Sequence, residues 1–182
     1  NLGLLNIVMV ALGIPLYLAL YAAHRKANQA LAALAVILSF IGTAVFYATN
    51  RAFPLLDLSS RYMTATTAAQ KMALEAAGQA MLSVGQSHTP GTFLAFFLAE
   101  IAGILMALVM LNGKVFSRGA SYAGFVGSGF LLVHEILASF VPSIHQAILI
   151  VAMIGGLANL VWYILIARRL LQLKLDERND KK

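Results

Sequence analysis

The sequence contains no cysteine and few charged residues. Of its 182 residues only 11% are charged, with 7 acidic and 13 basic side chains. The absence of cysteine excludes thiolate catalysis, disulfide bonds and metal or cluster sites built on sulfur. A soluble domain of this size carries roughly 25% charged residues. The shortage of charge therefore excludes a soluble enzyme, a secreted disulfide scaffold and a disordered chain.

Apolar residues are abundant instead. They make up 60% of the chain, and the mean hydropathy is +0.83. About 20 consecutive apolar residues are needed for a helix to cross a bilayer. Five segments reach this length: 2–23, 29–48, 92–111, 120–140 and 144–167. We predict an all-α polytopic membrane helix bundle with five transmembrane helices, forming a single membrane domain over 1–182.

Positive charge is concentrated in alternate connections. Arg25 and Lys26 follow the first span, Lys114 and Arg118 follow the third, and six of the 13 basic residues lie in 168–182. Cytoplasmic loops carry an excess of Lys and Arg. We predict a bacterial inner (plasma) membrane protein with its N-terminus outside and a cytoplasmic basic tail at 168–182. The net charge of +6 then reflects topology and attraction to anionic lipid, and we expect no nucleic-acid partner.

The connection between the second and third spans is long, and we predict an extramembrane helical segment at 54–88. Thr67 and Gln70 have the spacing of a capping box, which marks a helix start. The following residues, 68–82, are good helix formers with an apolar stripe. We expect an outer-side amphipathic helix that lies over the mouth of the bundle or in the membrane interface.

Small residues recur along the last three spans, for example Gly103, Gly127 and Gly155. Membrane helices associate through small residues that let backbones approach closely. We therefore predict a compact contact among spans three, four and five. The same stripes also suit contact with other membrane-protein subunits, so they leave the oligomeric state open.

Ionisable residues within the spans carry the main functional information. Charge inside a bilayer is costly, so such residues face the bundle interior and have partners. From the distance of each residue to its span end, we predict a polar cluster in the outer half of the bundle. Its members are Glu100, His134, Glu135, Thr43, Asn6 and His145.

Three interpretations of this cluster stay open. It is a buried hydrogen-bonded network, a pocket for a small polar or amphipathic ligand, or a metal or catalytic site. His134 and Glu135 are adjacent and point about 100° apart on a helix, which suits one ion poorly. No His-Glu-x-x-His sequence, nucleophile elbow or phosphate loop is present. We predict no catalytic residues, no metal ligands and no cofactor, with haem, pigment or a divalent metal at His134 left as alternatives.

The residues from Asn50 to Tyr62 and from Ala65 to Gln70 carry a family resemblance, with the pattern N-R-A-F-P-L-L-x-L-S-x-x-Y followed by A-T-T-x-A-Q. The run Trp162–Leu170 is similar too. The chain resembles a group of bacterial multi-pass membrane proteins known only as a domain of unknown function. The resemblance implies inner-membrane residence and, in many members, a further span that would precede Asn1. It implies no reaction, cofactor or catalytic residue.

These observations favour a protein that is not an enzyme. We predict an accessory or interaction subunit, or a small-ligand-binding membrane protein that acts through its outer polar cluster. The alternative is an intramembrane enzyme, or a haem, pigment or metal carrier, that uses Glu100, His134 and Glu135. The expected partners are the lipid bilayer and other membrane-protein subunits.

Overall fold

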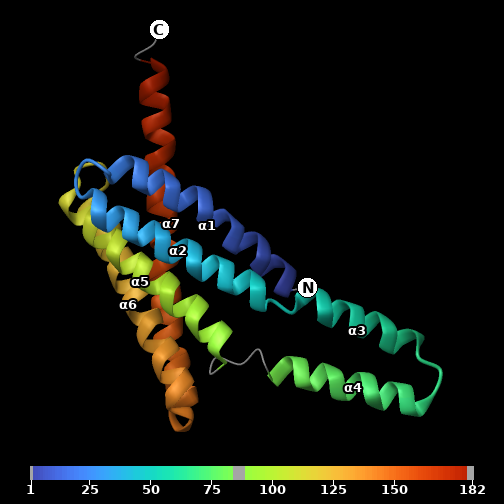
Figure 1. The fold of residues 1–182 in the computed structure, drawn as a ribbon. Coiled ribbons are helices and arrows are strands. Elements are labelled where there is room, and N and C mark those ends of the chain that lie inside the picture. Colours follow the sequence, from blue (N-terminus) through green and yellow to red (C-terminus); the bar gives the residue numbers. More distant parts are fainter. Residues whose placement is uncertain (1, 84–88, 180–182) are drawn as a thin grey trace.

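The computed structural model describes residues 2–83 and 89–179. Apart from the short 3-10 turn η1, its elements are α-helices. The elements are α1 (Leu2–His24), α2 (Gln29–Thr49), α3 (Ala52–Thr64), α4 (Ala68–Ser83), α5 (Pro90–Asn112), α6 (Arg118–Phe140), η1 (Pro142–Ile144) and α7 (His145–Asn179). Within the described residues, five helices (α1, α2, α5, α6 and α7) are long and apolar enough to cross a membrane. The predicted all-α polytopic bundle is confirmed (Figure 1).

The five long helices pack mainly as a series. α1 lies against α2, α2 against α5, α5 against α6, and α6 against α7. Of the predicted contacts among α5, α6 and α7, those of α6 with α5 and with α7 are present, whereas α5 and α7 do not pack on each other. The extensive contact of α2 with α5 was not predicted. It depends on Gly42, where an added Cβ would lie 2.8 Å from the carbonyl oxygen of Ala95. A side chain at this position would push the two helices apart.

The buried core lies toward the end of the bundle where α1 and α5 finish and α6 begins. Its largest side chains include Leu20, Met106, Met110, Trp162 and Ile166, each no more than 1% exposed. We call this the basic end, because the short connections there carry Arg25, Lys26 and Lys114. In Figure 1, α6 and α7 diverge from α1 and α2 away from this end. We call the opposite end, where these helices spread apart, the open end.

The connection at the basic end between α5 and α6 is fastened on two sides. The His24 ring stacks on Phe116 with 5.2 Å between ring centroids, and its Nδ1 lies 2.9 Å from the Leu20 carbonyl oxygen. On the other side, Arg169 Nε donates to the Val115 carbonyl oxygen at 2.8 Å. These contacts tie the end of α1 and the C-terminal part of α7 to the same loop.

The segment between α2 and α5 forms two helices that extend beside the bundle (Figure 1). The capping box is confirmed, because Gln70 N–H donates to Thr67 Oγ1 and Thr67 N–H donates to Gln70 Oε1, both at 3.2 Å. Among the described elements, α4 packs only on α3. The helix α3 packs on α4 and on α1, and its first turn lines a cavity together with residues of α2 and α5. The helix α4 therefore does not cover the mouth of the bundle, whereas the first turn of α3 lies there. Placement of the segment in the membrane interface stays a prediction.

Candidate functional site

Three polar side chains from three helices lie at the middle of their spans. Glu100 stands ten residues after the start of α5 and twelve before its end. Ser128 stands ten residues after the start of α6 and twelve before its end. Asn159 is likewise near the midpoint of the apolar span Ala147–Leu173 within α7. We call these three mid-span residues of α5, α6 and α7 the mid-span cluster.

Close helix packing brings the members of the mid-span cluster together. Glu100 precedes Gly103 by three residues on α5, so both lie on the face of α5 that meets Ser128. One turn along α5, a Cβ added to Gly103 would collide with the Ser128 side chain and lie 3.7 Å from the Tyr17 hydroxyl oxygen. On α6, a Cβ added to Gly127 would lie 2.7 Å from Asn159 Oδ1. Two glycines therefore make room for the polar contacts.

A second acid borders the cluster on its open side. Glu135 on α6 is 6% exposed and interacts electrostatically with Glu100. Its Oε1 atom and Asn159 Oδ1 are both buried, and neither has a hydrogen-bond partner among the described residues. Two buried oxygen atoms in and beside the cluster, Asn159 Oδ1 and Glu135 Oε1, thus lack a hydrogen-bond donor in the described part of the chain.

The structure distributes the predicted site residues over several places. Glu100 and Glu135 lie on the neighbouring helices α5 and α6, whereas Asn6 is exposed at the far end of α1 and lines a separate cavity. Thr43 is half-buried on α2, and His134 is half-buried and engaged in an interaction of its own. His145 begins α7, but its side chain lies outside the described part of the chain. Within that part, no group of three or more His, Asp and Glu residues is arranged around a common metal position.

Sequence reasoning missed three contributors to the mid-span cluster, namely Ser128, Asn159 and Tyr17. Ser128 and Asn159 are 1% and 7% exposed, respectively. Counting each residue from both ends of its span would have placed Glu100, Ser128 and Asn159 in the same layer. Tyr17 reads from the sequence as an interfacial aromatic, and only its contact near Gly103 places it inside the bundle.

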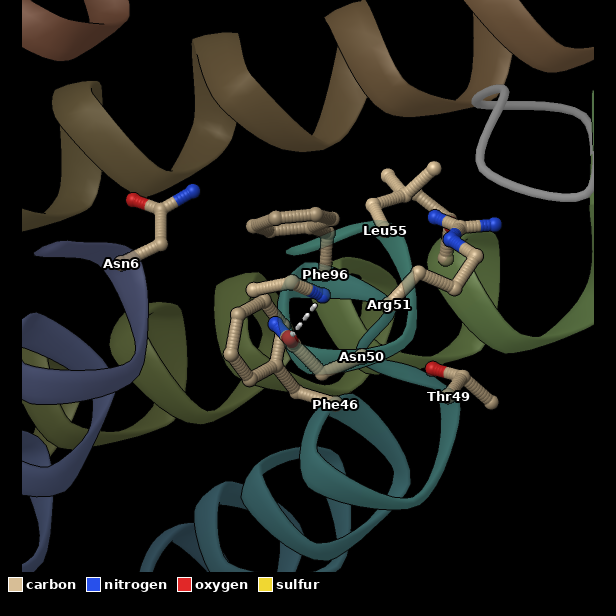
Figure 2. A pocket seen from close by; sticks show the side chains of 9 residues that line it. Asn6, Phe46, Thr49, Asn50, Arg51, Leu55 and Phe96 are labelled. Carbon is tan, nitrogen blue, oxygen red and sulfur yellow. Dashed lines mark hydrogen bonds between the residues drawn. The ribbon is translucent and has the colours of Figure 1, made fainter. Parts of the chain in front are cut away.

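A cavity of about 260 Å³ lies at the open end, where α1, α2, α3 and α5 meet (Figure 2). Its lining residues are Asn6, Phe46, Thr49, Asn50, Arg51, Ala52, Leu55, Thr92 and Phe96. We call it the Arg51 cavity. In Figure 2 the Phe46 and Phe96 rings lie between Asn6 and Arg51. The cavity therefore combines aromatic walls with polar groups on two sides.

Local structure holds Arg51 at the first turn of α3. Asn50 Oδ1 accepts a hydrogen bond from Ala52 N–H at 2.9 Å, so its amide fixes the turn between α2 and α3. Phe46 meets Phe96 edge-on, with 6.3 Å between ring centroids. Arg51 Nη1 is buried and has no hydrogen-bond partner among the described residues. A buried cationic donor without an acceptor is costly, so this arrangement is suited to an anion.

The whole arrangement, five long apolar helices with a connecting helical pair, extends over the region that a known family covers. The chain belongs to the family described as a domain of unknown function, DUF4386. The DUF4386 match covers residues 2–167, so it includes the mid-span cluster and the Arg51 cavity. No curated protein and no solved structure gives a significant match to the chain. The resemblance to an uncharacterised membrane family is confirmed, and functional inference for this DUF4386 chain starts from its site geometry.

Proposed function

We propose that this protein binds a small anionic amphiphile in the Arg51 cavity. The observation that carries the proposal is Arg51 Nη1, which is buried without a hydrogen-bond partner among the described residues in a cavity that Phe46 and Phe96 also line. This cavity favours the ligand-binding form of our sequence prediction over an accessory subunit, because a docking role requires no buried guanidinium.

The chemistry of the cavity supports a ligand with a charged head and an apolar body. A guanidinium group binds carboxylate or phosphate through two parallel hydrogen bonds. The first turn of α3 starts beside it. Ala52 N–H already donates to Asn50 Oδ1, Leu55 N–H donates to the Arg51 carbonyl oxygen and Pro54 has no N–H, so the helix contributes through the positive end of its dipole. Aromatic rings suit the apolar part of the ligand. A volume of about 260 Å³ accommodates a headgroup with a short apolar stretch, while a longer chain extends into the bilayer.

We place the Arg51 cavity in the outer leaflet of a bacterial inner membrane. The support is the charge distribution, because the basic end carries the clustered Lys and Arg residues expected of cytoplasmic loops. With the basic end in the cytoplasm, the open end faces the other side. The ligand would then reach the cavity from the outer leaflet or the adjoining aqueous phase.

Labelling of single introduced cysteines tests this orientation, because the chain has none of its own. Thr66 lies between α3 and α4 and Ala27 lies between α1 and α2, and both are exposed. We expect Thr66→Cys to react with a membrane-impermeant maleimide in intact cells. Ala27→Cys should react only after the membrane is permeabilised. The reverse pattern would show that the basic end faces outward.

Replacement of Arg51 tests ligand binding. We expect Arg51→Gln to weaken binding of phosphatidylglycerol at least tenfold, because a hydrogen bond to a charged group contributes about 1.5–3 kcal/mol. Binding would be measured by native mass spectrometry of the purified protein, with phosphatidylcholine as the comparison lipid. Equal affinity of the original protein and the Arg51→Gln variant would refute the proposal.

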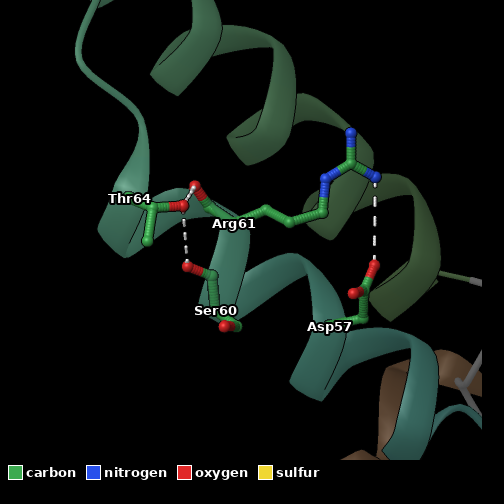
Figure 3. Close-up of polar contacts among 4 residues, drawn as sticks. All are labelled: Asp57, Ser60, Arg61 and Thr64. Atoms are coloured by element: carbon green, nitrogen blue, oxygen red, sulfur yellow. Dashed lines mark hydrogen bonds and ion pairs between the residues drawn. The ribbon is translucent and has the colours of Figure 1, made fainter.

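Arg61 provides a matched control on the same helix. Its side chain is 65% exposed and its Nη1 lies 3.8 Å from Asp57 Oδ2 (Figure 3). An exposed pair of this kind contributes less than about 1 kcal/mol. Arg61→Gln therefore removes the same charge from α3 without touching the Arg51 cavity. It should retain the lipid affinity of the original protein, which separates a specific site from general attraction to anionic lipid.

A further inference from the structure

We propose that the occupant of the Arg51 cavity controls whether α3 and α4 are docked against the bundle. We call these two helices, Ala52–Thr64 and Ala68–Ser83, the arm. The inference rests on the proposed function, because it requires an anionic amphiphile in the Arg51 cavity. It adds a regulatory consequence of binding, namely that the amphiphile fixes the position of the arm relative to the five long helices.

The arm leaves and rejoins the bundle at one point. Thr49 is the last residue of α2, and Gly91 is the second residue of α5. A Cβ added to Gly91 would collide with the Thr49 side chain, so these two positions are in contact. Because both ends of the connection start from this single point, the point of attachment alone does not fix the direction of the arm.

Few contacts hold the arm elsewhere. All residues of α3 and α4 are described, and none of them is buried. Among the described elements α4 packs only on α3, and α3 packs on α4 and α1. In Figure 1 the arm extends away from the five long helices. Segments with few buried apolar contacts open at a low free energy, so a single bound ligand is enough to decide whether the arm is docked.

The membrane helices around the Arg51 cavity are held by contacts of their own. The Tyr47 hydroxyl of α2 donates to the Ile7 carbonyl oxygen of α1 at 3.1 Å. Phe46 of α2 meets Phe96 of α5 edge-on. These contacts do not involve the arm, so the cavity walls that α1, α2 and α5 provide do not depend on its position.

The Arg51 cavity lies between these two parts of the molecule. Leu55 belongs to the arm and Arg51 directly precedes it, whereas Asn6, Phe46 and Phe96 belong to the membrane helices. Figure 2 shows Arg51 and Leu55 on one side of the Phe96 ring and Asn6 on the other. A ligand that fills the cavity therefore contacts the arm and the membrane helices together.

Binding and docking are linked for this reason. A ligand shifts an equilibrium toward the state that it binds better, and the docked arm is the state that places Arg51 at the cavity. Arg51 Nη1 has no acceptor among the described residues, so an anion also removes a cost of docking. For a ligand that binds the docked state alone, the ratio of undocked to docked arm falls about tenfold at about ten times the Kd.

Two spin labels on the full chain measure the position of the arm. Thr66→Cys at the tip of the arm is paired with Ala27→Cys at the basic end, and both positions are exposed. The chain has no cysteine of its own. Pulsed electron spin resonance gives the distribution of label distances in phosphatidylcholine-containing micelles, before and after phosphatidylglycerol is added. We expect phosphatidylglycerol to narrow this distribution, with the undocked-to-docked ratio reduced about tenfold at about ten times the Kd.

Matched variants show whether the response comes from the cavity. Arg51→Gln should lose the narrowing, whereas Arg61→Gln, which removes the same charge at an exposed position of α3, should keep it. Ala27→Cys paired with Ser143→Cys in η1 monitors the bundle without the arm and should not respond. If Arg51→Gln does not fold, Arg51→Lys takes its place, because it keeps the charge but not the two parallel hydrogen bonds.

Native mass spectrometry of the same labelled samples separates this inference from the proposed function. If phosphatidylglycerol binds through Arg51 but the Thr66–Ala27 distances stay the same, control of the arm is refuted and the binding site stands. Equal narrowing in Arg51→Gln would also refute the inference, because the response would then arise outside the cavity. If phosphatidylglycerol does not bind, the proposed function fails and this inference fails with it.

Discussion

Replacement of Trp162 by alanine is expected to lower the free energy of unfolding by about 3–5 kcal/mol, the usual cost of truncating a buried aromatic residue. Trp162 is 1% exposed and is the largest side chain of the core. Its ring fills the space above Gly124, where an added Cβ would lie 2.6 Å from Cε2. Unfolding in mixed detergent, followed by circular dichroism, measures the loss.

A lipid-facing aromatic residue on the partner helix serves as the control. Phe125 on α6 is 42% exposed, so Phe125→Ala exchanges protein–lipid contact for other protein–lipid contact and should cost less than about 1 kcal/mol. Equal losses for the two variants would show that the α6–α7 contact does not hold the bundle together.

A double-mutant cycle gives a sharper test of the same contact. Gly124→Ala should destabilise the original protein, because its Cβ collides with the Trp162 ring. In the Trp162→Ala background the ring is gone, and the same change should be nearly neutral or stabilising. Residues in direct contact show interaction energies of about 0.5–3 kcal/mol, and additive effects would contradict the observed packing.

The parts of the fold that could be predicted are those that local rules or the bilayer fix. The thickness of the hydrocarbon region sets the length of each apolar span, which is why five membrane helices follow from composition and run length. The capping box at Thr67 and Gln70 is equally local, because both partners lie within one turn. Pro54 near the start of α3 is compatible with a helix, since its missing N–H falls in the first turn.

Contacts between distant segments could not be predicted in the same way. The packing of α2 on α5 depends on one glycine, Gly42, and on the rotation of both helices about their axes. Distance from one span end placed Glu100 in the outer half of the bundle, but Glu100, Ser128 and Asn159 all lie near mid-span. Helix rotation decides which polar groups meet, and the sequence does not specify that rotation.

The Arg51 cavity was missed for a related reason. Arg51 follows the second span and reads as an ordinary loop cation. Its burial results from four helices meeting around the first turn of α3, with Asn6 contributed from the start of the chain. The sequence places Asn6 near the start of the first span, but it does not show that Asn6 lines this cavity and lies apart from Glu100.

The replacement Gly127→Leu is expected to destabilise the protein by about 3 kcal/mol, the upper part of the usual range for overpacking. The new Cβ would lie 2.7 Å from the backbone nitrogen of Asn159 and 2.7 Å from its Oδ1. A backbone atom cannot rotate away, so α6 and α7 must separate. Thermal unfolding of the purified protein in detergent, followed by circular dichroism, measures the loss.

Gly129→Leu is the matched control on the same helix. No described atom lies within 4 Å of a Cβ added at Gly129, so a leucine there faces lipid. Both variants change helix propensity and apolar volume equally, and only one of them forces two backbones apart. We expect Gly129→Leu to keep or raise the melting temperature. If Gly129→Leu lowered the melting temperature as much as Gly127→Leu, the loss of stability would come from the leucine itself. The close approach of α6 and α7 at Gly127 would then not be its cause.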